Sequence, residues 1–72
     1  MRENPLREWR HARNLTALDV ALKLDVSEQT VYSYELGRFE PATDKVNALA
    51  ALMGLDATQF RLRWHFWKTN RT

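Results

Sequence analysis

The sequence predicts an all-α fold of five helices. Helix-capping residues occur at intervals along the 72-residue chain, and its two glycines are placed to end helices. Apolar residues recur at the three- and four-residue spacing of helices. The length allows one modest core. Because the chain has no cysteine, neither disulfides nor a thiolate metal site can supplement that core. The expected structure is therefore a compact domain held together by helix packing.

The first helix is expected to run from Pro5 to about Arg13. Asn4 is a suitable N-cap, and Pro5 takes the first helical position, where its missing N–H loses no hydrogen bond. The second helix begins after Thr16, and Asp19 three residues later forms a short variant of the capping box. The inward-facing residues of this second helix are Val20, Ala21 and Leu24.

The third helix is expected from Glu28 to about Leu36. Ser27 is its N-cap and Gly37 ends it, because glycine adopts a positive φ without strain. Between the second and third helices the chain turns at Asp25, a residue type that tolerates left-handed backbone.

A loop containing Pro41 leads to the fourth helix, for which Thr43 or Asp44 is the expected cap. Gly54 ends that helix, and Asp56 with Gln59 three residues on begins a fifth. The expected inward-facing residues of the fourth helix are Val46, Leu49, Ala50, Leu52 and Met53.

The aromatic segment 60–67, FRLRWHFW, is compatible with two structures. Alternating apolar residues indicate a strand that pairs with a second copy, whereas Phe60, Trp64 and Trp67 share one face of a helix. Five large apolar groups exceed what a small core absorbs, so we expect a homodimer interface here. The alternative is that the tail folds back onto its own core. The expected interface residues are Phe60, Leu62, Trp64, Phe66 and Trp67.

Charge is distributed unevenly along the chain. Residues 1–13 carry a net charge of +2, residues 14–60 carry −4, and residues 61–72 carry +4. A nucleic-acid-binding protein usually presents a basic face. Because only the ends of this chain are basic, charge alone supports nucleic-acid binding weakly.

Several classes of protein are not expected. No apolar run approaches the ~20 residues of a membrane span, and no signal peptide is evident, so the expected compartment is the cytoplasm. His11 and His65 lack metal-ligand spacing. Neither a nucleophile–base arrangement nor a glycine-rich phosphate loop is present. We therefore expect no enzyme activity, cofactor, metal or small-molecule effector.

Residues 16–35 match two short helices joined by a tight turn, with small Ala21 where the helices approach. Taken with its flanks, the segment from Leu6 to Phe60 resembles the phage repressor and Cro type of helix-turn-helix domain. We accordingly expect a DNA-binding domain over residues 1–60 and an aromatic, basic extension over residues 61–72. The resemblance depends on Leu15-Thr16, Ala21, Val26-Ser27, Val31, Glu35-Leu36-Gly37-Arg38 and Pro41.

The resemblance implies that the helix from Glu28 lies in the major groove of DNA. Gln29 suits a bidentate contact to adenine, Glu28 can accept a hydrogen bond from cytosine, and Ser33 adapts to either. Alternatively, Glu28 only complements the helix dipole. The implied base-reading residues are Glu28, Gln29 and Ser33, together with Thr30 and Tyr32.

Contacts to the DNA backbone are implied for Ser27, Arg38, Arg10 and Thr16, which hold the register of the complex rather than read sequence. The resemblance also implies a partly buried ion pair between Arg10 and Glu35.

Two departures from the family weaken the expected DNA surface. Ala17 stands where many relatives have a DNA-contacting glutamine, and Asp25 stands in place of the turn glycine. We therefore expect modest monomer affinity and reliance on dimerisation. The expected function is a dimeric transcriptional regulator, a repressor, on a palindromic operator with half-sites about 34 Å apart. The alternative is an antitoxin or protein-interaction module that uses the tail and the apolar pair Leu18 and Leu22.

Overall fold

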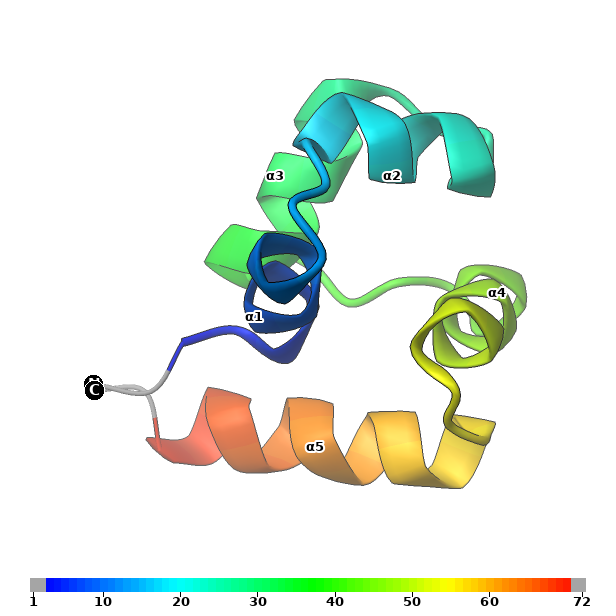
Figure 1. Cartoon of the computed structure of the whole chain (residues 1–72). Coiled ribbons are helices and arrows are strands. Elements are labelled where there is room, and N and C mark those ends of the chain that lie inside the picture. Colours follow the sequence, from blue (N-terminus) through cyan, green and yellow to red (C-terminus); the bar gives the residue numbers. More distant parts are fainter. Residues whose placement is uncertain (1–2, 71–72) are drawn as a thin grey trace.

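Residues 3–70, the part of the chain that this computed structural model describes, contain five α-helices joined by short loops (Figure 1). In Figure 1, α5 lies along one side, α1 and α4 rest on it, and α2 and α3 lie on the opposite side. No strand occurs within that range, so the predicted five-helix, all-α fold is confirmed. The helices are α1 (Pro5–Ala12), α2 (Ala17–Leu24), α3 (Glu28–Leu36), α4 (Thr43–Met53) and α5 (Ala57–Asn70).

Side-chain caps begin the first three helices as predicted. The Asn4 side chain accepts hydrogen bonds from two backbone N–H groups of α1, at 2.9 and 3.1 Å. Thr16 and Asp19 form a reciprocal capping box at α2, and the Ser27 hydroxyl accepts the N–H of Thr30 at 3.1 Å. These bonds satisfy N–H groups that have no partner inside the helix. Local sequence therefore sets where the first three helices begin.

The predicted cap of α4 was wrong. Ala42 is the N-cap, with extended backbone and no side-chain hydrogen bond, and both Thr43 and Asp44 already lie inside the helix. The Thr43 hydroxyl instead lies 3.4 Å from Arg61 of α5. The side chain predicted as a cap is thus used in a contact between helices.

The turn between α2 and α3 has the predicted left-handed residue. Asp25 has a φ of 57°, and the N–H of Val26 donates to the carbonyl of Ala21 at 3.0 Å. Gly37 and Gly54 end α3 and α4 with φ near 74° and 73°. Left-handed backbone strains an aspartate only moderately, so the tight turn forms without the family's glycine.

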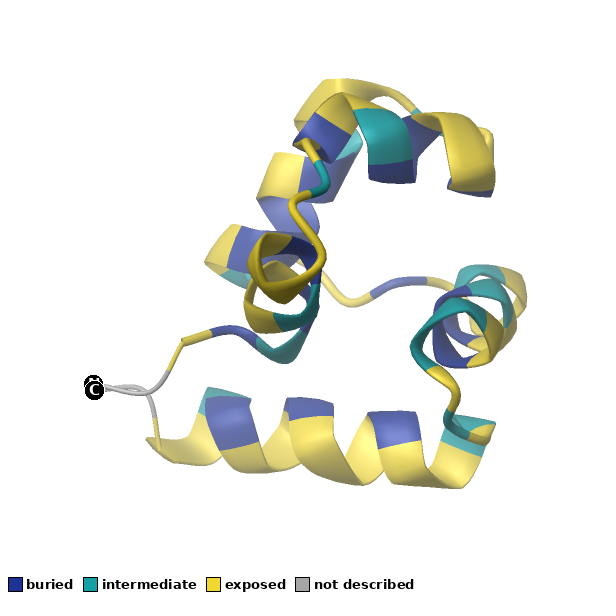
Figure 2. Ribbon diagram, in the orientation of Figure 1, coloured by how far each residue is buried: buried dark blue, intermediate teal, exposed yellow. Residues whose placement is uncertain are grey.

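The core is a single cluster to which all five helices contribute (Figure 2). From α5, the Phe60 and Trp64 rings stack at 5.3 Å, and Trp64 meets Trp67 edge-on at 5.5 Å. The other buried apolar residues are Leu6, Ala17, Val20, Ala21, Leu24, Val31, Tyr34, Val46, Leu49 and Ala50. The predicted inward-facing residues Leu52 and Met53 are half-buried against this cluster.

The aromatic tail is a helix, which rules out the strand alternative for residues 60–67. Helix α5 crosses the expected boundary at residue 60 without interruption and points Phe60, Trp64 and Trp67 into the chain's own core. Three of the five predicted interface residues are therefore interior, because positions separated by four and then three residues share one helical face. Leu62 and Phe66 remain 65% and 52% exposed.

A buried ion pair joins α1 to α3. The Arg10 guanidinium donates through Nε and Nη2 to the two carboxylate oxygens of Glu35, at 2.7 and 2.9 Å. Its Nη1 donates to the carbonyl of Leu15 at 3.1 Å. The side chains are only 8% and 2% exposed, and the hydrogen bond to Glu35 raises the pKa of Arg10 above its ordinary value. The predicted pair is confirmed.

Removing one partner of this pair is expected to destabilise the domain severely. Arg10→Met leaves the buried Glu35 carboxylate without a counter-charge, and we expect a loss of about 3–5 kcal/mol in the free energy of unfolding. Urea denaturation measures this loss. Replacing both partners, Arg10→Met with Glu35→Leu, should recover most of it. The control is Arg7→Met, which breaks an exposed pair with Glu3 and should cost less than about 1 kcal/mol; an equal loss there would contradict the interpretation.

Candidate nucleic-acid interface

The packing of α3 against the rest of the domain decides which of its side chains reach solvent. Val31 and Tyr34 are buried in the core, and Glu35 is held by Arg10. The face opposite these residues exposes Glu28, Gln29 and Tyr32. The first turn of α3 therefore presents a carboxylate and an amide to solvent, and the phenol of Tyr32 follows one turn later on the same face.

The predicted base-reading residues fall into two groups. Glu28, Gln29 and Tyr32 are exposed together at the outer face of α3. Thr30 is half-buried, and its hydroxyl shares a hydrogen bond with that of Ser27 at 2.8 Å. Ser33 is only 8% exposed. The structure thus brings three of the five residues to one surface and withdraws Ser33 from it.

The predicted backbone-contacting residues also differ in accessibility. Thr16 and Ser27 are exposed N-caps whose oxygens accept backbone N–H groups, so the hydroxyl proton of Thr16 remains available to a phosphate. Arg38 is exposed directly after the glycine that ends α3. Arg10 is buried, and three of its N–H groups are already used within the chain. Its position is that of a structural residue.

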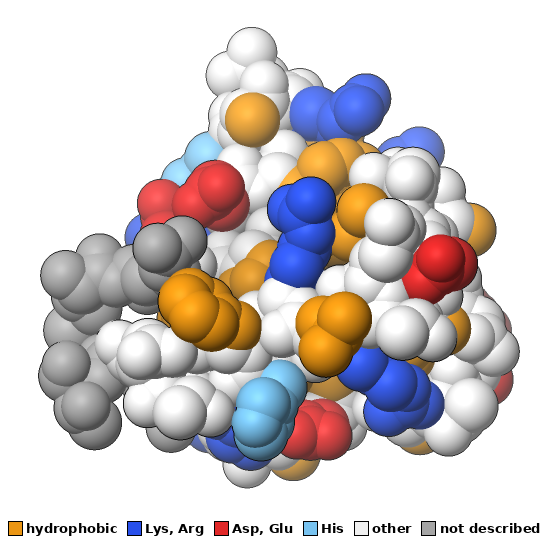
Figure 3. Space-filling model, turned by 90° about the horizontal axis from the view of Figure 1, so that it is seen from below, with side chains coloured by type: hydrophobic (Ala, Val, Ile, Leu, Met, Phe, Trp, Pro, Cys, Tyr) orange, Lys and Arg blue, Asp and Glu red, His pale blue; other side chains and the backbone are white. Residues whose placement is uncertain are grey.

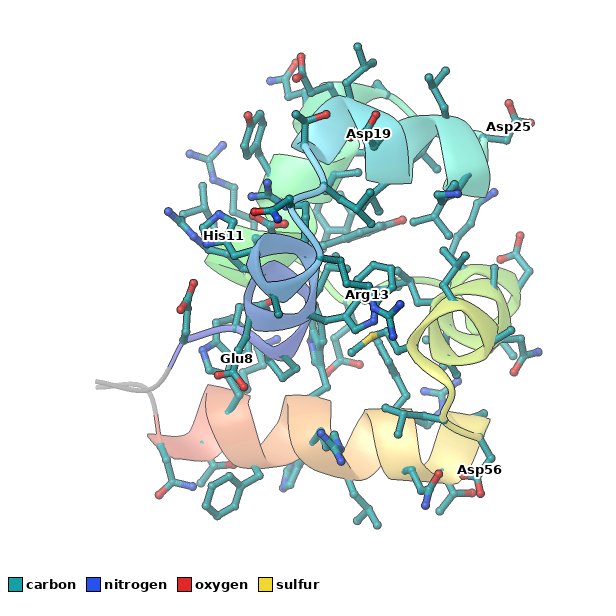
Figure 4. All side chains as sticks on the ribbon, in the orientation of Figure 1. Glu8, His11, Arg13, Asp19, Asp25 and Asp56 are labelled. Carbon is teal, nitrogen blue, oxygen red and sulfur yellow. The ribbon has the colours of Figure 1, made fainter. Side chains whose placement is uncertain are left out.

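Acidic side chains surround this surface. Asp19 and Asp25, both labelled in Figure 4, lie at the two ends of α2, and exposed Glu28 begins α3. The exposed cations of residues 17–38 are Lys23 and Arg38. Accepting the backbone N–H of Thr16 lowers the pKa of Asp19 below its ordinary value, so this carboxylate is ionised at neutral pH. Repulsion from the acids would weaken attraction to phosphate.

Two hydrogen bonds between distant segments position the α2–α3 pair, and sequence reasoning missed both. The Lys45 ammonium of α4 donates to the carbonyl of Leu24 at the end of α2, at 2.8 Å. The Asn4 amide donates to the carbonyl of Tyr34 in α3 at 3.4 Å. The partners are 21 and 30 residues apart, so no local spacing rule relates them.

Within residues 3–70, no group of three or more histidine or acidic side chains is placed to hold a metal ion. The helices of that same range include none that is long and apolar enough to cross a membrane.

Comparison with known proteins relates most of the chain to helix-turn-helix proteins. A family model described as helix-turn-helix matches residues 6–60, which include α1 from its second residue, α2 through α4 and the start of α5. An uncharacterized HTH-type transcriptional regulator of Methanocaldococcus jannaschii is 36% identical over 53 residues, covering 74% of this chain and 80% of that protein. No solved structure matches the chain significantly.

The capping box of α2 makes a testable contribution to acid stability. Because the pKa of Asp19 is lowered by folding, its stabilising effect is present above the ordinary value of 3.8 and is lost as the pH falls through the folded pKa. Asp19→Asn should remove this loss, because the amide cannot titrate. Thermal unfolding of both proteins from about pH 7 to about pH 2 measures the difference. If the unfolding temperatures of the two proteins changed in parallel with pH below the ordinary pKa of Asp19, the stabilising role of its carboxylate would be contradicted.

Proposed function

This chain belongs to the phage repressor and Cro-type family of helix-turn-helix proteins, and we propose that it is a dimeric transcriptional repressor of a palindromic operator. The proposed ligand is double-stranded DNA, and the proposed place of action is the cytoplasm. One observation carries the proposal. The first turn of α3, free of packing on its outer face, exposes Glu28 and Gln29 side by side.

The chemistry of this turn suits base edges in the major groove. The Gln29 amide has a donor and an acceptor spaced for the N6 and N7 atoms of adenine, and the Glu28 carboxylate accepts only, as cytosine N4 requires. Tyr32 lies one turn further along the same exposed face and offers a hydroxyl and an aromatic edge. Ser33 and Thr30 take a secondary role in the proposal because they are less accessible.

Contacts to phosphate would hold α3 in register. Arg38 supplies a cation just beyond the C-terminal end of α3, and the capped N-termini of α2 and α3 supply the hydroxyls of Thr16 and Ser27. Arg10 contributes by holding α1 against α3. One exposed arginine and two hydroxyls are few contacts for a monomer in an acidic surrounding, which favours cooperation between two copies.

Dimerisation through the outer face of α5 would suit a palindromic operator. Leu62 and Phe66 are exposed there, and Phe60, Trp64 and Trp67 support them from the core. In Figure 1, α5 lies on the opposite side of the domain from α2 and the first turn of α3. Two copies joined through α5 would leave both reading surfaces accessible, with half-sites about 34 Å apart.

A protein-binding role is a second candidate, favoured by two leucines of α2. Leu18 and Leu22 are 51% and 73% exposed and follow one another by one helical turn. Adjacent exposed leucines are suited to packing against an apolar partner surface. An antitoxin or an antagonist of another regulator would use such a surface, with or without DNA binding.

Substitutions on α3 and after it should separate base reading from phosphate binding. We expect Gln29→Ala to weaken binding to the preferred operator by about 1–3 kcal/mol and to relax specificity at one base pair. Arg38→Ala should weaken binding to all sequences alike and reduce the dependence of log K on log salt by about one. Selection from a random DNA pool, followed by titration at several salt concentrations, measures both effects.

Asn47→Ala is the matched control, because Asn47 is an exposed polar residue of α4 outside the proposed surface. Its operator affinity should equal that of the wild type. If Gln29→Ala behaved like this control while Leu18→Ala and Leu22→Ala abolished capture of a co-purified protein, the protein-binding candidate would replace the operator proposal.

A further inference from the structure

A groove runs between α1 and α5 on the side of the domain away from α2. Its volume is about 320 Å³, and its walls come from α1 and the residues just before it, from the end of α4 and the connection to α5, and from the middle of α5. Figure 3 shows apolar and basic side chains next to one another on the face of the domain that includes α5. The residues lining the groove are Glu3, Pro5, Glu8, Trp9, Ala12, Met53, Leu55, Arg63, Phe66 and Trp67.

Opposite charges stand on the two walls without pairing to any other of residues 3–70. Glu8 extends from α1 toward α5 in Figure 4, and Arg63 is on α5. Both are exposed, and neither forms an ion pair with any other residue from 3 to 70. Glu3, the other acid of the groove, lies 3.6 Å from Arg7 and 3.4 Å from His11. One acid and one base of the groove are therefore available to a partner.

The apolar part of the groove continues onto the outer face of α5. Trp9, Met53 and Leu55 are half-buried in its lining. Phe66 stands in the same lining yet is 52% exposed, and Leu62 lies one helical turn before it with 65% exposed. The groove and the apolar side chain that could fill such a groove are thus adjacent on one surface.

We propose that this groove receives Phe66 of a second copy of the chain, with Glu8 of each copy paired to Arg63 of the other. A two-fold interface brings the same patch of both subunits together, so the patch must be self-complementary. A patch with an unpaired acid, an unpaired base, an apolar groove and an exposed phenylalanine meets this requirement. This inference rests on the dimeric function proposed above, and it specifies the surface and the pairing.

The dimensions are compatible with this occupant. A cavity of about 150 Å³ accommodates a benzene ring, so a groove of about 320 Å³ has room for a phenylalanine side chain. A stable interface buries about 800 Å² per partner, or about one sixth of the 4720 Å² surface of the chain. The groove alone does not supply that area. The interface must therefore include the neighbouring outer face of α5 with Leu62.

Charge reversal tests the pairing directly. Glu8→Arg and Arg63→Glu each place like charges opposite one another twice in the dimer, and we expect each to raise the dimer dissociation constant by at least about ten-fold. The double variant restores opposite charges and should return the constant to within about three-fold of the wild type. Sedimentation equilibrium of the full chain measures the dimer dissociation constant of the wild type, both single variants and the double variant. Circular dichroism checks that each of the four is folded.

Phe66→Ala should also weaken the dimer by at least about ten-fold, because it empties the groove. Arg61→Glu and Asn47→Ala are matched controls, since Arg61 lines a different pocket beside α5 and Asn47 is an exposed residue of α4. Both controls should leave the dimer dissociation constant within about two-fold of the wild-type value. The inference would be overturned if the wild type were monomeric or if the double variant did not regain the wild-type dimer dissociation constant. It would also be overturned if the controls weakened the dimer as much as the groove variants do.

Binding to a single half-site separates this inference from the proposed function. Groove variants should bind an isolated half-site as well as the wild type does, because α3 is untouched, and should lose affinity only for the full operator. If the groove variants kept their affinity for the full operator, the groove interface would be refuted, whereas the proposal that α3 reads DNA would be unaffected. Loss of half-site binding only in Gln29→Ala would support DNA reading independently.

Discussion

The Arg10–Glu35 ion pair is the interaction on which the placement of the reading helix depends. Its two short hydrogen bonds tie α1 to α3, and the third bond from Arg10 to Leu15 ties α1 to the segment that leads into α2. One guanidinium therefore orients both helices of the proposed DNA surface. A buried charge without its partner is strongly destabilising, so this part of the fold tolerates few other arrangements.

A 72-residue chain can bury only a small core, and helix α5 contributes a large part of it. Three aromatic rings at one helical face belong to the core cluster that the other helices also line, and Trp64 contacts both of the others. Leu62 and Phe66 of the same helix stay exposed. The aromatic segment thus contributes to the core on one face and leaves a partly apolar, basic surface on the other.

Local sequence patterns predicted the elements that depend on near neighbours. The caps at Asn4, Thr16 and Ser27 and the left-handed turn at Asp25 were predicted because each uses atoms within a few residues. The cap of α4 was mispredicted because Thr43 is engaged near α5 instead. Within the proposed site, residue types predicted which side chains could read bases, but only packing withdrew Ser33 and left Glu28, Gln29 and Tyr32 outside.

By itself, the sequence determined the helix count, most helix boundaries and the family, because capping, turn chemistry and apolar spacing are local properties. The tertiary structure decided between helix and strand for residues 60–67, since both periodicities were present and only burial distinguishes them. It also decided which aromatic groups are interior, and it brought Glu8 and Arg63 to facing walls of one groove. Residues 55 positions apart line one groove only because α1 packs on α5, which no local pattern specifies.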